Sequence, residues 1–523
     1  MHSRNADRSR WKIWNSSLPL MVAVLGSLYF LLFRFPFTPV WSEFDQYGFI
    51  LDASRIWRGE VIYRDFFSLT PPGIEAVHLA IFSVFGLRNW IPDFMVILTG
   101  VPLVWLTVFI SGKVLSGRRF LAWLPAALFL AFGFLPSMQD SHRWFSSVAV
   151  MAALAVLMNE RSVRRVAVAG ALCGLTSFFT QTEGIFVVTG VVVFLIWEGY
   201  RAKSAPGVAI ARIAVLTASF LVAGVVTYGY FVYQAGPDSV WDCLVRFPAR
   251  YYPLDRENNS LAAYFTEFPP IPPLRNLFAL RHYVLIQMIL PLVCAVFAVW
   301  QWRRDLVKPE GARLMLICFV GLSLYASVAP TPSYFRLCTV SPPAIVLLIY
   351  WLGGEASWRR IAIWLLWIGA LFATLNAIAR VQNSAVTVLQ LPRGPIAFSG
   401  NDSADYQLLS WLSEHTHEGG VFFAAGEPGI FFPLGLWPVS RVSGLDNTGY
   451  TRIEDVQNSI ATLDRYRVKL IEWPPTSCNP EFYRPEEDHL KPLRDYVHSH
   501  YHMLKQFRSG DNSEVLEIWQ RSE

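Results

Sequence analysis

The segment WSEFDQYGFILDASRIWRGEVIYRDFFSLTPPG, Trp41–Gly73, directly follows the hydrophobic run LPLMVAVLGSLYFLLF, residues 18–33. It places several carboxylates just after the first stretch long enough to cross a membrane: Glu43, Asp45, Asp52, Glu60 and Asp65. A charged group at the boundary of a bilayer is costly unless it has a partner or a function. This segment raises two questions: whether the chain spans a membrane, and what these acidic residues do at the membrane surface.

The composition is that of a membrane protein. Of 523 residues, 53% are hydrophobic and only 16% are charged, whereas a soluble domain is about 25% charged. The mean hydropathy is +0.35, and the 20 Trp and 38 Phe residues suit lipid-facing and interfacial positions. We predict a multi-spanning α-helical membrane protein, in which the distribution of charge matters more than the net +5.

A helix that crosses the hydrocarbon core needs about 20 mostly apolar residues. The sequence offers about eleven candidate spans, some of which need flanking residues or local bilayer thinning to reach across. They are Ser17–Phe35, Ile91–Ser111, Phe120–Leu135, Trp144–Met158, Val166–Thr180, Gly184–Trp197, Ile213–Tyr233, Tyr283–Trp300, Leu314–Ala329, Val340–Leu352 and Ile361–Ala379.

Basic residues fall on alternate loops and predict the orientation. Cytoplasmic loops carry an excess of Lys and Arg, and the basic segments are residues 1–12, 111–119, 159–165, 198–212, 301–313 and 353–360. The N-terminus is therefore predicted to be cytoplasmic, and an odd number of spans places the C-terminus outside. The first helix lacks a small-x-small cleavage site, so we interpret it as a retained anchor. The outer face is the periplasm if the membrane is a bacterial inner membrane, and the secretory lumen in a eukaryote.

The chain divides into a membrane body (residues 1–380), a polar linker (381–401) and an extracytoplasmic domain (402–523). In the last part the hydrophobic period alternates between helix and strand, which favours a small α/β domain. We predict helices over 405–416, 452–467 and 489–501, and strands over 419–426, 468–475, 502–508 and 514–521. The GEPG of residues 426–429 is not a GxGxxG motif, so it predicts no nucleotide site.

Two helices are expected to lie at the outer surface of the membrane. Residues 44–59 carry apolar side chains at helical spacing and end at Gly59, and residues 71–86 begin with two prolines but are too short to span. Six scattered cysteines form neither a CxxC motif nor a metal-binding spacing. Three cysteines are expected on the outer side: Cys243, Cys338 and Cys478. One disulfide could form among them, but the sequence does not identify which two would pair.

The order of short motifs in the first loop resembles that of the GT-C superfamily of membrane glycosyltransferases. The motifs are Asp45, ASRIWRG (53–59), GEVIYRDF (59–66), PPG (71–73) and VFG (84–86). The resemblance is to the branch of protein O-mannosyltransferases, the lipid A aminoarabinose transferase and bacterial relatives that elaborate surface polysaccharide. It extends to GLTSFFTQTEGIFVV (174–188) and SYFRLCTVSPPAIVLL (333–348). It thus covers most of the membrane body and rests on the order of the motifs.

The resemblance implies a GT-C fold and transfer of a sugar, with inversion, from a polyprenyl-phosphate or diphosphate donor to a hydroxyl of a glycan, lipid or protein. Asp45 matches the family's catalytic base, and Asp140 lies where relatives hold the acceptor or the sugar. Arginine binds phosphate with a bidentate fork. The aminoarabinose transferase has a Lys just before its PP, where this chain has Thr70, so the phosphate must be held elsewhere. The candidate substrate-binding residues are Glu43, Arg64, Asp65, His142, Arg143, Arg246, Arg250 and Arg336, with Arg336 the first choice.

The same residues admit simpler interpretations. Asp52, Glu60 and Glu75 fit an ordinary solvated loop, and each arginine could extend to lipid headgroups. No DxD motif is present, so no metal or other cofactor is expected, although EFD and QDSH contain oxygen ligands that a divalent cation could use. The expected partners are the lipid-linked donor, the acceptor and membrane lipids, with no nucleic acid. The alternatives are a flippase of lipid-linked sugars and a non-catalytic scaffold. The near absence of charge within the candidate spans argues against transport.

Overall fold

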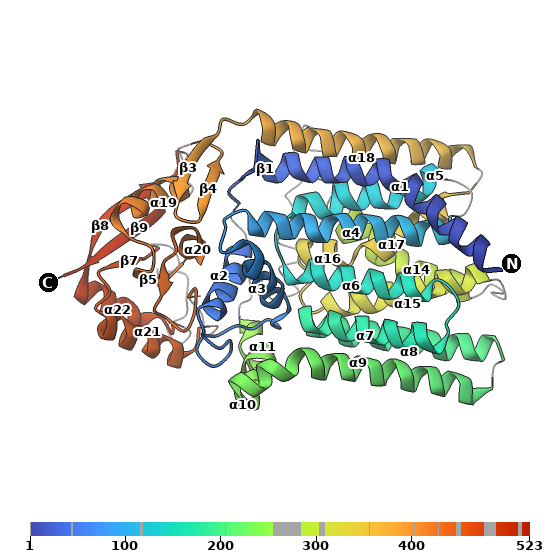
Figure 1. Ribbon diagram of the computed structural model, residues 1–523, viewed down its shortest axis with the longest axis horizontal. Helices are drawn as coiled ribbons and strands as arrows, with labels where there is room; N and C mark the ends of the chain where they lie inside the picture. The colour runs from blue at the N-terminus through green and yellow to red at the C-terminus, as the bar shows by residue number, and fades with distance from the viewer. Residues whose placement is uncertain are drawn as a thin grey trace.

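The computed structural model is an elongated helical bundle with a small α/β domain at one end (Figure 1). The two termini lie at opposite ends of the molecule (Figure 1). The structure describes the whole chain except residues 1, 43–44, 116–118, 204, 255–283, 303–308, 355, 401–402, 427, 446–450, 475–487, 511–514 and 523.

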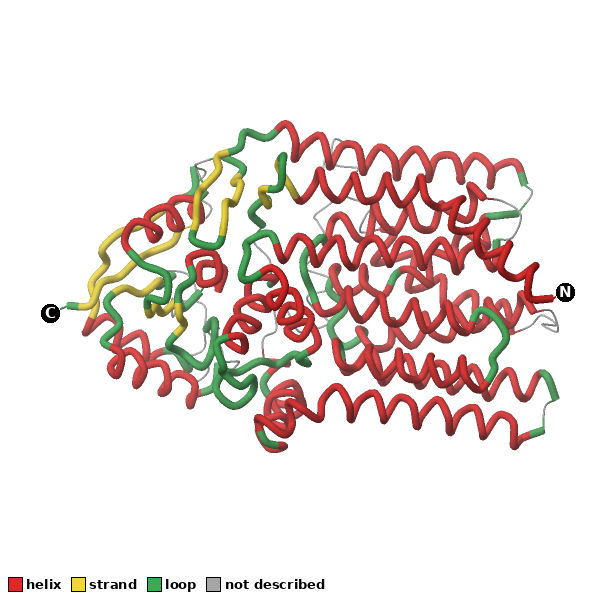
Figure 2. The backbone as a smooth tube through the Cα atoms, in the orientation of Figure 1, coloured by secondary structure: helices red, strands yellow, loops and turns green. Residues whose placement is uncertain are grey.

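Long, nearly parallel helices form the bundle (Figure 2). In chain order the principal ones are α1 (His2–Leu32), α4 (Ile91–Val114), α5 (Arg119–Leu128), α6 (His142–Leu157), α7 (Val163–Phe179), α8 (Gln181–Arg201), α9 (Pro206–Ala235), α14 (Leu290–Trp302), α15 (Pro309–Val328), α17 (Pro342–Leu352) and α18 (Ser357–Asn383). After α5 the chain continues through a π-helical turn, η1 (Phe129–Phe134), and a 3-10 turn, η2 (Leu135–Ser137).

Among the described residues, six helices are long and apolar enough to cross a membrane. A seventh crossing results if α16 (Tyr334–Val340) and α17, which meet at a 65° bend, form one span. Four further apolar helices are shorter, at 10–17 residues. The predicted segments thus fall on helices, but the length criterion does not establish eleven crossings. The prediction also counted four shorter segments as full spans: the apolar part of α1 (Ser17–Leu32), α6, α7 and the Val284–Trp300 segment that includes most of α14.

The outermost helices expose hydrophobic side chains. In α9 and α18 only 6% of the apolar window is buried, and Val225 and Val226 are more than 70% exposed. A continuous apolar surface of this extent is unfavourable in water but suited to lipid. This arrangement confirms the membrane class predicted from composition.

The two predicted surface helices are present beside the bundle: α2 (Gln46–Trp57) and α3 (Gly73–Phe85). Gly73 begins α3 where a Cβ would lie 2.6 Å from the carbonyl oxygen of Phe178 at the end of α7. Only glycine permits this approach, so the PPG motif packs the first loop directly onto the bundle.

The C-terminal domain is built on a five-stranded sheet in the order β6-β5-β7-β9-β8. Its strands are β5 (Val421–Ala424), β6 (Trp437–Pro438), β7 (Leu470–Glu472), β8 (Tyr501–Arg508) and β9 (Val515–Arg521), and its helices include α19 (Ala404–His415), α20 (Phe431–Leu434), α21 (Ile453–Tyr466) and α22 (Lys491–His500). Strand β5 lies between two parallel neighbours, β6 and β7, and is buried on both faces: Phe422 packs into one core cluster and Phe423 into the other. The predicted tail helices and strands are confirmed.

Residues 381–401, predicted as a linker, contain the antiparallel hairpin β3 (Thr387–Leu391) and β4 (Gly394–Phe398). Ala397 pairs with Val40, and its carbonyl accepts the N–H of Trp41 at 2.8 Å. Pro and Gly lie at the turn of this hairpin, which joins the first loop to the C-terminal domain, so the segment is more ordered than its polar composition indicated.

None of the five described cysteines (Cys173, Cys243, Cys294, Cys318 and Cys338) forms a disulfide. Cys478 lies outside the described residues.

Candidate active site

Asp45 lies immediately before α2, at the end of the bundle that carries the C-terminal domain. Its backbone carbonyl accepts the N–H of Gly48 at 2.9 Å, while its side chain is exposed. The surrounding protein nevertheless removes enough water to raise the pKa of the carboxyl, and the charges of Arg336 and Arg143 partly offset that rise. Asp45 is thus an open carboxylate within electrostatic reach of two guanidinium groups, with a pKa shifted toward the range useful to a general base.

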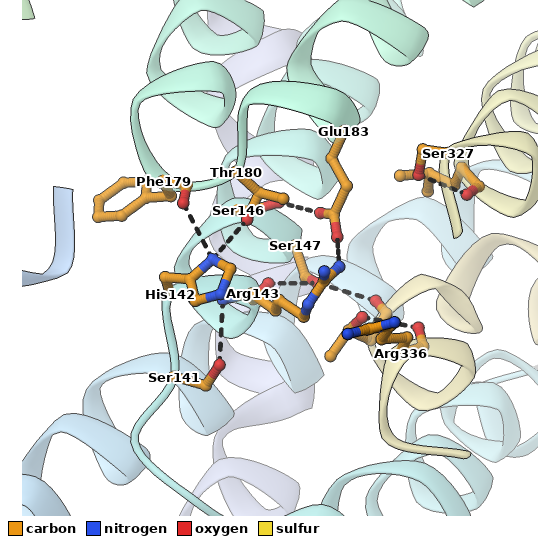
Figure 3. Close-up of polar contacts among 12 residues, drawn as sticks. Ser141, His142, Arg143, Ser146, Ser147, Phe179, Thr180, Glu183, Ser327 and Arg336 are labelled. Carbon is orange, nitrogen blue, oxygen red and sulfur yellow. Dashed lines mark hydrogen bonds and ion pairs between the residues drawn. The ribbon is translucent and has the colours of Figure 1, made fainter. Parts of the chain in front are cut away.

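Arg143 occupies the first turn of α6, where the Ser141 hydroxyl accepts its backbone N–H at 3.3 Å. Its Nη1 lies 2.9 Å from Oε1 of Glu183, at the start of α8 (Figure 3). Glu183 is fully buried, and its second oxygen accepts the hydroxyl of Ser146. Both oxygens of this buried carboxylate have hydrogen-bond partners, so Glu183 holds the Nη1 end of the Arg143 guanidinium in a fixed position.

Arg336 lies in the first turn of α16, where the hydroxyl of the N-cap residue Ser333 accepts its backbone N–H. Its Nη1 donates to the carbonyl of Thr331 at 2.9 Å, and its Nη2 donates to the hydroxyl of Tyr252. The Ser147 hydroxyl ties the two helices together by donating to the Thr339 carbonyl at 2.8 Å. Two helix starts thereby hold Arg143 and Arg336 at one level of the bundle (Figure 3).

His142 connects this site to the break between α7 and α8. Its Nδ1 lies 3.0 Å from the Phe179 carbonyl oxygen and 2.9 Å from the Thr180 hydroxyl. A carbonyl only accepts, so Nδ1 carries a proton in this arrangement. The ring edge also packs against Phe49 of α2, with 5.5 Å between centroids.

Asp140 is buried rather than open to the site. Its Oδ2 lies 2.8 Å from Nε2 of His78 in α3, and both side chains are completely shielded. Its backbone N–H donates to the side chain of Gln46, the first residue of α2, at 3.3 Å. Burial raises the pKa of Asp140, against the opposing effect of His78. The structure places Asp140 where it joins the loop between η2 and α6 to both α2 and α3, and its proposed contact with substrate stays a prediction.

The remaining candidates lie in local pairs. Arg64 contacts Asp65 at 2.8 Å, and Asp65 also accepts the N–H of Val61 at 2.8 Å, which orders the turn after α2. Arg246 contacts Asp242 at 3.1 Å, and the exposed Arg250 lies over the ring of Tyr251. Glu43 lies outside the described residues. The structure therefore brings together Asp45, His142, Arg143 and Arg336, whereas Arg64, Asp65, Arg246 and Arg250 pair with sequence neighbours.

The solvated-loop interpretation was wrong for two of its three acids. Asp52 is 8% exposed and Glu75 is fully buried. Burial raises the pKa of Asp52 to about 7, and burial next to Asp52 raises the pKa of Glu75 well above its ordinary value. Glu60 forms an ion pair with Arg55 at 2.7 Å. The helical spacing of α2 and α3 indicated apolar faces, but it could not show that these faces close on each other over the acids.

Sequence reasoning missed two members of the site, Glu183 and Tyr252. Glu183 was detectable as a carboxylate at the start of an apolar helix, a position that usually marks a buried pair or a functional group. Tyr252, in the turn η4 (Tyr252–Leu254), carried no comparable signal. In the part of the chain that the structure describes, no group of three or more His, Cys, Asp or Glu side chains could hold a metal ion.

No protein-family model matches this sequence, and no curated protein matches it. Solved structures do match. ArnT from Cupriavidus metallidurans bound to undecaprenyl phosphate aligns with a TM-score of 0.59 over 96% of this chain and 97% of that one, at 11% identity. Its apo state aligns over the same shares, with a TM-score of 0.55 and 12% identity. The chain thus has the overall fold of these ArnT structures, which confirms the fold expected from the resemblance of the first-loop motifs.

Proposed function

We propose that this protein is an inverting glycosyltransferase that moves a sugar from a polyprenyl-phosphate-linked donor to a hydroxyl of a cell-envelope acceptor. The observation that carries the proposal is the exposed carboxylate of Asp45 within electrostatic reach of the guanidinium groups of Arg143 and Arg336. The proposal includes an inner-membrane location with a cytoplasmic N-terminus and a periplasmic C-terminal domain. The basic loops support this orientation.

The arrangement supplies the two chemical tasks of such a transfer. The acceptor oxygen forms a bond to C1 of the sugar while the bond from C1 to the phosphate oxygen breaks, and the phosphate leaves with that electron pair. Asp45 receives the proton of the acceptor hydroxyl, and the two arginines stabilise the charge on the departing phosphate. Developing positive charge at C1 makes a nearby carboxylate favourable for a second reason.

The fold supports a lipid-linked donor, since ArnT was solved with undecaprenyl phosphate bound. Thr70 stands where the aminoarabinose transferase has a Lys, and its carbonyl accepts the Tyr63 hydroxyl at 2.7 Å. We therefore assign the phosphate to Arg143 and Arg336. No metal or other cofactor is required by this scheme.

The test is transfer of labelled sugar from polyprenyl-phosphate donors in membranes containing wild-type protein or Asp45→Asn, with protein amounts matched. Asparagine keeps the shape of the side chain but cannot accept the proton, so activity should fall about 100- to 10,000-fold, the usual contribution of general base catalysis. Asp495→Asn makes the same chemical change on the exposed face of α22 and serves as the control. Near-normal turnover by Asp45→Asn would remove the base assignment. Donor translocation without transfer would favour a flippase.

A further inference from the structure

The guanidinium of Arg452, in the C-terminal domain, contacts the membrane body. Its Nη1 lies 2.7 Å from Oδ2 of Asp242, and its Nε lies 2.8 Å from Oδ2 of Asp455 in α21. Arg452 is only 8% exposed. We call these three residues the Arg452 clasp. A largely buried guanidinium shared by two carboxylates holds its partners in a defined geometry.

Aromatic packing extends the clasp toward the site. The Arg452 guanidinium lies 5.0 Å from the ring centroid of Phe67 and 5.6 Å from that of Phe247, and these two rings pack edge to face at 4.6 Å. Phe247 then stacks on Tyr251 at 5.5 Å. The segment from Asp242 to Tyr251 is therefore fixed by charge at its start and by ring contacts along its length.

The next residue of this segment reaches the candidate active site. The Tyr252 hydroxyl accepts from Nη2 of Arg336, and its ring lies 5.7 Å from that guanidinium. Arg336 in turn interacts electrostatically with Asp45 and Arg143. These contacts thus connect the C-terminal domain to a guanidinium of the site through a single short segment.

We propose that Arg452 is a positioning residue, which orients the Arg336 guanidinium for the donor phosphate by holding residues 242–252 in place. The inference rests on the proposed function and gives the C-terminal domain a part in it. Arg336 binds the phosphate in both the ground state and the transition state, so its misplacement weakens donor binding more than the chemical step. Loss of the clasp should therefore raise the donor KM and leave kcat nearly unchanged.

The kinetic test compares Arg452→Ala, Arg452→Lys, Tyr252→Phe and the Arg452→Ala/Tyr252→Phe double variant with the wild type. Arg452→Ala and Tyr252→Phe should each raise the donor KM about tenfold, the order of effect expected when a positioned group is released. The double variant should show no more than about the same tenfold rise in donor KM. Both changes interrupt the same chain of contacts from Arg452 to Arg336, so their effects should not multiply. Arg452→Lys keeps the charge and should restore part of the loss. Lys491→Ala, which breaks an exposed ion pair on α22, should match the wild type. An unchanged KM in Arg452→Ala, or a multiplied, roughly hundredfold effect in the double variant, would overturn the proposal.

A second measurement does not depend on catalysis. Hydrogen exchange of the full-length protein in detergent should speed up in peptides covering residues 242–254 of Arg452→Ala, but not of Lys491→Ala. Unchanged exchange would overturn the mechanical link whether or not the protein transfers sugar. If the wild type transfers no sugar while exchange responds as expected, the proposed function fails and the clasp stands.

Discussion

Replacing Asp52 by asparagine should stabilise the protein at neutral and alkaline pH. Asp52 is 8% exposed, and its Oδ1 has no hydrogen-bond partner within the described structure. Burial raises its pKa from 3.8 to about 7, so the folded protein holds a proton that the unfolded chain releases near pH 4. Folding stability therefore falls as the pH rises from about 4 to 7, and the loss persists above pH 7.

The size of the effect follows from the shift. A difference of about 3 pKa units, at about 1.36 kcal/mol each, gives at most about 4 kcal/mol. Asparagine keeps the shape and the neutral charge that the folded state prefers. The advantage of Asp52→Asn over the wild type should thus be smallest near pH 4.5, where most of the difference has yet to develop, and should reach several degrees in unfolding temperature near pH 8.

The assay is thermal unfolding of purified protein in detergent, followed by intrinsic tryptophan fluorescence from pH 4.5 to 8.5 at one scan rate. Asp495→Asn, whose carboxylate is 63% exposed beside Lys491, provides the matched control and should change the profile little. Parallel pH profiles for the wild type and Asp52→Asn would refute the reasoning, because they would mean that Asp52 is ionised in the folded protein.

Two further predictions concern the site and the membrane orientation. The variant Glu183→Gln leaves the charge of Arg143 without its buried partner. Because breaking a buried ion pair is costly, we expect kcat/KM for transfer to fall about tenfold or more. Equal kinetics in the variant and the wild type would show that Arg143 is positioned without this carboxylate. The variant Arg164→Cys, in the first turn of α7, should react with a membrane-impermeant maleimide only after the membrane is permeabilised to expose its cytoplasmic side. Met503→Cys on β8 should react in intact cells. The reverse pattern would contradict the predicted orientation.

Sequence reasoning reached the parts of this protein that depend on local pattern. Hydropathy located the bundle helices, and the alternating period of the tail located the strands and helices of the C-terminal domain, because each signal reflects which face of an element is buried. Asp45 was identified because a carboxylate at a membrane boundary is costly without a function, and because it matches the catalytic base that the family resemblance implies. Arg143 and Arg336 were candidates to hold the phosphate, and Arg336 was the first choice because it matches a helix-entry motif of that family.

Contacts between segments that are far apart in the chain could not be predicted from the sequence. Nothing local distinguishes Asp140, whose side chain is enclosed with that of His78, from Asp45, whose side chain is exposed. Asp52 and Glu75 looked like surface acids because one helix cannot show what the next helix covers. The Tyr252 contact with Arg336 joins residues 84 positions apart, a relation that only the folded chain defines.

The first loop, which holds Asp45, is translated long before the segments that contact it, among them the β3–β4 hairpin. The indole Nε1 of Trp41 donates to Asp405 at 2.7 Å across 364 residues, and its ring stacks on Tyr47, two residues from Asp45. The loop that holds Asp45 emerges early in translation, but the groups that fix it emerge only after α18 is complete. Contacts of such long sequence separation form late and slowly. We therefore expect the nascent first loop to remain open to proteases until translation ends, so a chain shortened within its last quarter would be inserted in the membrane yet inactive.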